Sequence, residues 1–174
     1  MMMADSALLV DTCVLLEASN RARSQHRPAR ELIGRHEGLV FPAQVAREFL
    51  VVATRPPANN GLGLALSEAL ESLAGFREHI RLLPEEKPLL PTLLGLLAQS
   101  PATGKRIHDA HLVAAAMVHR VPLVVTLNGD DFKDFTAHVT CLKPAEAIAG
   151  IAKKRISDYS PLPKNALVPR TKSG

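Results

Sequence analysis

Acidic residues follow two apolar runs of the chain, at the points where buried strands would end. Asp11 closes the run ALLVD, and the adjacent acids Asp130 and Asp131 come shortly after VPLVVT. The carboxyl ends of parallel strands lie at one edge of a sheet, so these carboxylates are expected to meet although they are far apart in sequence. Carboxylate oxygens gathered in this way suit a hard metal ion.

Two more acids lie where the helical pattern is apolar. In the helix expected from residue 43, Glu48 falls within the stripe formed by Val45, Phe49 and Val52. Asp109 lies one turn before a similar stripe in RIHDAHLVAAAMVHR, residues 106–120. An unpaired buried charge costs several kcal/mol, so each of these carboxylates needs a partner.

Each acid, taken alone, also has a purely structural explanation. Asp11 with Thr12 could cap the N-terminus of the following helix, and Glu48 could form a surface ion pair with Arg47 or Arg55. Asp109 could interact with the dipole of its own helix, and Asp130 or Asp131 could cap a turn. Their conjunction favours a metal site, because clustered carboxylates repel one another and a divalent cation neutralises them. Mg²⁺ or Mn²⁺ held in this way would lower the pKa of a bound water and direct it at a phosphate ester.

The elements that must position these acids alternate along the chain. Short apolar runs predict strands at 7–11, 38–41, 80–83, 121–126 and 138–142. Helical periodicity predicts helices at 12–18, 28–37, 43–54, 64–79, 88–99, 106–120 and 144–154. Two of these helices, 43–54 and 64–79, flank the breaker RPPANNG and are expected to form a helical hairpin. Strands that are apolar throughout and alternate with helices predict an α/β fold with a parallel sheet covered on both faces.

Composition limits the other possibilities. The chain has 174 residues, 47% of them hydrophobic, which suits one domain with a sizeable core. It has no Trp and one Tyr, which argues against nucleic-acid binding on aromatic platforms. Cys13 and Cys141 lack metal-ligand spacing and are expected to be reduced. No apolar run approaches the roughly 20 residues of a membrane span, so a soluble, cytoplasmic protein is expected.

Charge divides the chain into two parts. Residues 1–152, the expected folded domain, carry a net charge of −1, and residues 153–174 carry +5. This end of the chain also contains three prolines and no apolar periodicity, so we expect a basic, flexible tail. Its ending, LVPRTKSG, resembles a protease-cleavage sequence from an expression tag.

Four motifs carry a family resemblance. They are VDT at 10–12, PAQVAREF at 42–49, IHDAHLVAAA at 107–116 and VTLNGDDF at 125–132. In order and spacing they resemble the four acidic motifs of the PIN-domain nucleases. The segment EFLVVATRPPANNGLGLALSEAL, residues 48–70, is similar to VapC-type toxins, the nucleases of type II toxin–antitoxin pairs.

The resemblance implies a three-layer α/β/α fold with a five-stranded parallel sheet, and Mg²⁺- or Mn²⁺-dependent cleavage of single-stranded RNA. By position, the catalytic and metal-binding acids would be Asp11, Glu48, Asp109 and Asp131, with Asp130 as the alternative fourth acid. Supporting hydrogen bonds would come from Thr12, Thr126 and Asn128. Leu127 stands where relatives often carry a basic residue, and Lys105 and Arg106 could supply the phosphate contact instead.

The resemblance also implies partners. A cognate antitoxin would cover the groove above the metal site, and the apolar hairpin helices favour a homodimer. Three other interpretations stay open at this point: a housekeeping PIN nuclease, a PIN-like module that binds without cutting, and a haloacid dehalogenase-type phosphatase. The last requires a second aspartate where Cys13 stands. His108 and His111 lack a third zinc ligand and are expected to be structural, with His111 a minor candidate for substrate contact.

Overall fold

Five short apolar segments pair in parallel as a single sheet. The computed structural model describes residues 7–150, so the predicted tail at 153–174 and the last residues of the predicted helix 144–154 lie outside the described residues. The strands are β1 (Leu8–Val10), β2 (Leu39–Pro42), β3 (Arg81–Leu83), β4 (Leu123–Val125) and β5 (Thr140–Leu142). Their order across the sheet is β3-β2-β1-β4-β5, and every pairing is parallel.

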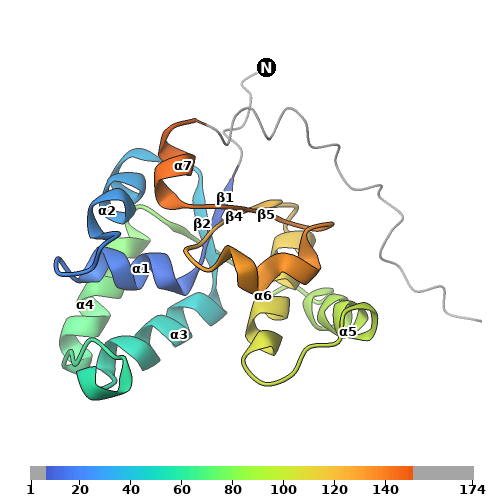
Figure 1. Cartoon of the computed structure of the whole chain (residues 1–174), viewed down its shortest axis with the longest axis horizontal. Helices are drawn as coiled ribbons and strands as arrows, with labels where there is room; N and C mark the ends of the chain where they lie inside the picture. Colours follow the sequence, from blue (N-terminus) through green and yellow to red (C-terminus); the bar gives the residue numbers. More distant parts are fainter. Residues whose placement is uncertain (1–6, 151–174) are drawn as a thin grey trace, which may run out of the picture.

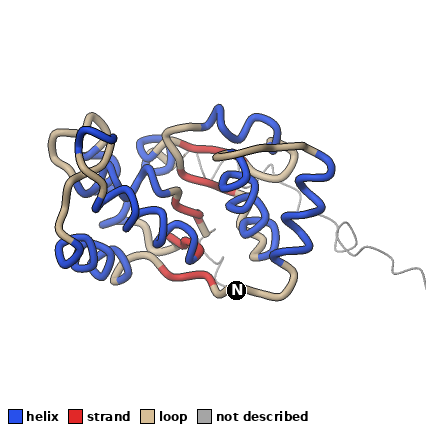
Figure 2. Tube along the Cα trace, turned by 90° about the horizontal axis from the view of Figure 1, so that it is seen from below, coloured by secondary structure: helices blue, strands red, loops and turns tan. Residues whose placement is uncertain are grey.

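Helices cover both faces of this sheet. They are α1 (Thr12–Ser19), α2 (His26–Arg35), α3 (Ala43–Thr54), α4 (Leu66–Arg77), α5 (Leu89–Gln99), α6 (Arg106–Val118) and α7 (Pro144–Ile148), with 3₁₀ helices η1 (Pro57–Asn59) and η2 (Gly129–Phe135). In Figures 1 and 2, α1 to α4 lie on one side of the strands and α5 and α6 on the other. This is the three-layer α/β/α architecture with a five-stranded parallel sheet, and the predicted fold class is confirmed.

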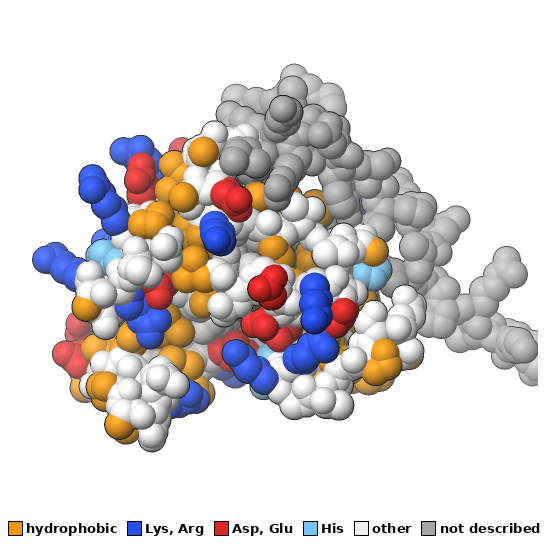
Figure 3. All heavy atoms as spheres, in the orientation of Figure 1, with side chains coloured by type: hydrophobic (Ala, Val, Ile, Leu, Met, Phe, Trp, Pro, Cys, Tyr) orange, Lys and Arg blue, Asp and Glu red, His pale blue; other side chains and the backbone are white. Residues whose placement is uncertain are grey.

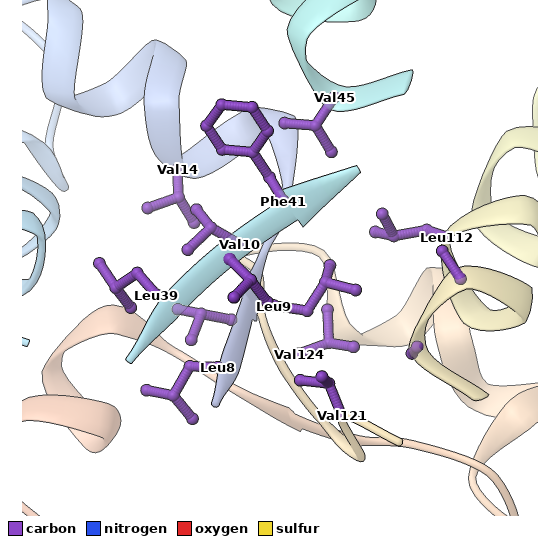
Figure 4. Packing of buried hydrophobic residues seen from close by; sticks show 14 of the residues in the cluster. Leu8, Leu9, Val10, Val14, Leu39, Phe41, Val45, Leu112, Val121 and Val124 are labelled. Carbon is purple, nitrogen blue, oxygen red and sulfur yellow. The ribbon is translucent and has the colours of Figure 1, made fainter. Parts of the chain in front are cut away.

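The central strands are buried on both faces, which explains why their sequences are apolar without alternation. Leu9 of β1 lies in register with Val40 of β2 and Val124 of β4, and all three are at most 1% exposed. Side chains from the helices complete the packing, as Val45 of α3 and Leu112 of α6 do around the strand residue Phe41 in Figure 4. Within residues 7–150, no helix is both long enough and apolar enough to cross a membrane.

The predicted hairpin consists of α3 and α4. Phe49 and Phe76 meet edge to face across it, with ring centroids 5.6 Å apart. The connecting loop folds back onto the end of α3, where a Cβ atom at Gly61 would lie 1.8 Å from the Arg55 carbonyl oxygen. The close approach of these two backbone segments therefore requires glycine at position 61.

Two local details differ from the sequence expectation. The segment after β4, expected as a plain turn, forms the 3₁₀ helix η2, whose Phe132 and Phe135 are buried. The second strand, predicted to end at residue 41, includes Pro42 as its last residue, opposite Leu83. Pro42 also immediately precedes the first residue of α3, where a missing N–H group costs little.

The order of the strands determines where a site can form. From β1 the chain builds outward through β2 to β3, and it then returns to place β4 on the other side of β1. The carboxyl ends of β1 and β4 therefore flank the point where the winding reverses, which is the usual place for a ligand in such sheets.

Candidate functional site

Asp11 lies at this reversal point, directly after β1, and both oxygens of its carboxylate accept hydrogen bonds. Oδ1 accepts from the backbone N–H of Thr12 at 2.6 Å, so Asp11 does N-cap α1 as the simpler explanation predicted. Oδ2 accepts from Thr126 Oγ1 at 2.7 Å and from Cys13 Sγ at 3.2 Å. Thr126 directly follows β4, so the first of these two bonds joins the ends of the two strands.

Burial dominates the electrostatics of this pair of strand ends. Burial raises the pKa of Asp11, and the nearby charge of Glu48 adds to this increase. The hydrogen bonds from Thr126, Cys13 and Thr12 oppose the increase, because they stabilise the charged carboxylate. Burial, with the Asp11 charge beside it, also raises the pKa of the Cys13 thiol to about 12. Cys13 is therefore protonated near neutral pH and acts as a hydrogen-bond donor to the carboxylate.

Glu48, on α3, approaches Asp11 from the neighbouring helix. Its Oε2 accepts from Thr12 Oγ1 at 3.1 Å, and its Oε1 lies 2.7 Å from Gln44 Nε2 and 3.2 Å from His108 Nδ1. The alternative partner Arg47 faces Glu85 instead, at 3.7 Å. Glu48 is thus held among polar groups of α1, α3 and α6.

Asp109 lies in the first turn of α6 and is half-buried. Its pKa is raised to about 6, first by burial and then by the charges of Asp131, Asp11 and Glu48, while Lys105 lowers it. Three other carboxylates therefore raise the pKa of Asp109, and the positive charge of Lys105 partly opposes them. All four predicted acids contribute to one negative region.

Asp131 and Asp130 differ in their placement on η2. Asp131 is half-buried and is the acid whose charge raises the pKa of Asp109 most, whereas Asp130 is exposed. The backbone N–H of Asp131 donates to the Asn128 carbonyl at 3.0 Å. Asn128 itself is exposed, and its backbone N–H donates to Thr126 Oγ1 at 3.0 Å.

Basic side chains border the acids. Lys105 is exposed at the start of α6, and Arg106 forms an ion pair with Asp134 of η2. On the face seen in Figure 3, Asp and Glu side chains gather near the centre, with Lys and Arg side chains next to them. His111 is half-buried, and burial lowers its pKa, so it adds little positive charge near neutral pH.

Cys13 and Gln44 contact these acids, although the sequence predicts neither residue at the site. The sequence predicts only a reduced cysteine at position 13, but Cys13 donates to Asp11. Gln44 is buried and connects Glu48 to the His108 carbonyl oxygen. The contact of Gln44 with Glu48 could have been predicted, because these residues are four apart and share one face of a helix. The nearness of Cys13 to Thr126, 113 residues away, needed the tertiary fold.

The donor set fits a hard divalent cation. In the described part of the chain, no three Asp, Glu, His or Cys side chains are already arranged to ligate one ion directly. Mg²⁺ typically takes one or two carboxylates and keeps several waters, so a closed cage of protein ligands is not required. Burial is the largest cause of the raised pKa of Asp109, and the charges of Asp131, Asp11 and Glu48 add to it, a repulsion that a cation would relieve.

Comparison with known families identifies the fold. The model of the PIN domain family matches residues 8–137, well over half of the chain. The chain belongs to the PIN domain family. The family predicted from the sequence is therefore confirmed. A search of curated proteins found no match to this PIN-domain chain.

Several solved structures share this PIN-domain fold. The Sarcin-Ricin loop cleaving toxin VapC20 of Mycobacterium tuberculosis is 16% identical, with a TM-score of 0.56 over 72% of this chain and 92% of its own. VapBC2 of Rickettsia felis, bound to a promoter DNA fragment, is 14% identical, with a TM-score of 0.58 over 79% and 98%. VapBC-1 of nontypeable Haemophilus influenzae is 12% identical, with a TM-score of 0.57 over 80% and 98%. At these identities the likeness establishes a VapC-like fold.

Proposed function

We propose that this PIN-domain protein is a metal-dependent endoribonuclease that cuts single-stranded RNA, and that it is the toxin of a toxin–antitoxin pair. The observation that carries the proposal is the convergence of Asp11, Glu48, Asp109 and Asp131. Burial raises the pKa of Asp109 to about 6, and the charges of the other three acids add to that shift. Such an arrangement destabilises a metal-free fold and is therefore expected where it serves a cation.

The four carboxylates would hold Mg²⁺ or Mn²⁺ directly or through water. When bound, the ion would lower the pKa of a water for attack on phosphorus and neutralise charge on the phosphate. Asp11 is the central ligand in this proposal, because two strand ends and a helix N-terminus fix its carboxylate. Its Oδ1 accepts one hydrogen bond and keeps acceptor capacity for a cation or its water, since a carboxylate oxygen offers about two lone-pair sites.

The residues around the acids orient them. Thr126 and Cys13 fix one oxygen of Asp11, and Thr12 links the two acids, through its N–H to Asp11 and its hydroxyl to Glu48. Thr12 and Thr126 are buried, so water does not compete for these hydrogen bonds. Outer partners of this kind typically set ligand geometry and change metal affinity when removed.

RNA is the proposed substrate on two grounds. VapC20, which shares the fold, is a Sarcin-Ricin loop cleaving toxin. In this chain, the exposed Lys105 next to Asp109 can contact a phosphate of an incoming strand, whereas Arg106 is already paired with Asp134. Lys105 is therefore the better candidate of the two for RNA contact.

Partners follow from the same relatives and from the surface of the hairpin. The structures of VapBC2 and VapBC-1 contain toxin–antitoxin pairs, which supports an antitoxin partner here. Val51 on α3 and Leu66 on α4 are 56% and 60% exposed, and apolar side chains exposed to this degree favour burial against another chain. We propose a homodimer that an antitoxin inhibits, acting in the cytoplasm.

Cleavage of a labelled single-stranded RNA pool tests this function. Purified protein is incubated with Mg²⁺, with Mn²⁺ or with EDTA, beside Asp11→Asn and Asp130→Asn from the same preparation. Metal-dependent cutting that is lost in Asp11→Asn and kept in Asp130→Asn supports a carboxylate–metal ribonuclease. Equal cutting by wild type and Asp11→Asn contradicts it, and RNA binding without cutting favours a non-cleaving module.

A further inference from the structure

A buried glutamine connects two of the acids through the backbone. Gln44 and Glu48 are four residues apart on α3 and therefore lie on the same face of that helix. The side-chain amide of Gln44 donates to Glu48 Oε1 at 2.7 Å and to the carbonyl oxygen of His108 at 2.9 Å. His108 precedes Asp109 in the first turn of α6. Gln44 thus ties the Glu48 carboxylate to the turn that carries Asp109.

The two acceptors fix the orientation of this amide. If the amide were turned by 180°, its oxygen would face the Glu48 carboxylate and the His108 carbonyl, and oxygen facing oxygen is repulsive. Both N–H groups of Gln44 are therefore committed to the connection between α3 and α6.

This arrangement has a cost that packing does not explain. Gln44 is 5% exposed, and its Oε1 is buried without a hydrogen-bond partner among the described residues. A buried acceptor without a partner destabilises a fold, and an apolar side chain of similar size would avoid the penalty. A glutamine at this position is thus better explained by what its N–H groups hold than by stability.

We propose that Gln44 is a positioning residue that sets the spacing of Glu48 from Asp109 and thereby the affinity of the site for a divalent cation. This inference rests on the proposed function. Without Gln44, Glu48 keeps its contacts with Thr12 Oγ1 and with the His108 side chain. It loses the amide that holds its carboxylate to the backbone of α6. Its carboxylate would then adopt more orientations, and cation binding would have to order it.

The test measures Mn²⁺ affinity and thermal stability on the same full-length protein. Gln44→Leu keeps the side-chain volume and removes both hydrogen bonds together with the unpartnered oxygen. Isothermal titration with MnCl₂ is expected to show binding about 10–100-fold weaker than in wild type. The Tm of the metal-free variant is expected to equal or exceed that of wild type, because the buried unpartnered acceptor is gone.

The opposite directions of these two changes separate positioning from a merely structural role. Thr92→Val is the matched control, because Thr92 is also a buried polar residue but lies on α5. The Mn²⁺ affinity of this variant is expected to equal that of wild type. Unchanged Mn²⁺ affinity in Gln44→Leu overturns the inference. A loss of affinity also overturns it if the metal-free Tm of Gln44→Leu falls, or if Thr92→Val loses affinity as well.

Asp11→Asn distinguishes this failure from failure of the proposed function. If wild type binds Mn²⁺ and Asp11→Asn does not, an unchanged Gln44→Leu overturns only the role of Gln44. If wild type binds no Mn²⁺, or Asp11→Asn binds it equally well, the proposed function and this inference fall together.

Discussion

Thr126 Oγ1 donates a 2.7 Å hydrogen bond to Asp11 Oδ2, across 115 positions of the sequence. Each residue directly follows a strand, and those strands, β1 and β4, are neighbours in the sheet. The backbone N–H of Asp11 also donates to the Val125 carbonyl at 3.0 Å, which continues the strand pairing up to the site. The position of the central carboxylate is therefore a direct consequence of sheet topology.

Removal of this hydrogen bond should impair the site without unfolding the protein. Thr126→Val keeps the shape of the side chain but leaves Asp11 Oδ2 with the weaker thiol donor of Cys13. We expect RNA cleavage to fall by about 10–100-fold, as for other outer partners of metal ligands. Single-turnover cleavage at saturating Mn²⁺ measures the effect. Thr54→Val, on α3, is the control, and equal rates in the two variants would contradict this role of Thr126.

The two adjacent acids of η2 should behave differently. Asp131 is half-buried and acts on Asp109, while Asp130 is exposed. We expect Asp131→Asn to lower Mn²⁺ affinity at least about 10-fold, which is the lower end of what is typical when an interaction at a metal site is removed. Asp130→Asn is expected to leave the Mn²⁺ affinity near the wild-type value. Titration of both variants with MnCl₂ decides between them, and the reverse order of effects would make Asp130 the fourth acid.

Burial of Asp109, together with the charges of the acids around it, predicts a pH dependence of metal-free stability. The pKa of Asp109 is about 6 in the folded protein and near 3.8 in the unfolded chain, so the folded state binds more protons between these values. Stability should therefore fall as the pH rises from about 4 to 6. For this half-exposed group we expect about 1 kcal/mol, less than the full shift implies, because solvent screens it.

Asp109→Asn provides the comparison for that pH effect. Urea unfolding in EDTA at pH 4.5 and pH 7 should show a smaller loss of stability in the variant than in wild type. Since burial raises the pKa of Asp11 as well, part of the pH dependence should remain. An identical loss in the two proteins would show that Asp109 does not contribute to the pH dependence.

Lys105 should contribute to RNA binding through its charge alone. Lys105→Ala is expected to weaken binding of single-stranded RNA to the Asp11→Asn protein and to reduce the slope of log K against log salt by about 0.7. Lys87→Ala, at another exposed lysine, is the matched control. Fluorescence anisotropy at several salt concentrations measures both slopes, and equal slopes would remove Lys105 from the RNA path.

The sequence predicts the elements well because strands and helices differ in the period of their apolar residues. Helix α3 begins and ends at the predicted residues, Ala43 and Thr54. The convergence of Asp11 with Thr126 follows from two strand ends meeting at one edge of a parallel sheet. For η2 only a turn is predicted, because its burial depends on how Phe132 and Phe135 meet the rest of the core.

Contacts around the acids are harder to predict, because they depend on side chains brought together by tertiary packing. Cys13 has the composition of a core residue, and only the nearness of Asp11 Oδ2 makes it a donor. Arg106 has the charge of a phosphate contact, but the fold places Asp134 next to it. His108, expected to be structural, has a 62% exposed side chain and contacts Glu48.

The most direct test of the proposed site is to locate the cation. Crystals of the protein grown or soaked with MnCl₂ are measured at the manganese absorption edge, and an anomalous difference map is calculated. We expect a peak among Asp11, Glu48, Asp109 and Asp131 in wild type and no peak there in Asp11→Asn. A wild-type map without density among these four carboxylates, or with its peak elsewhere, would contradict a metal-dependent nuclease built on them.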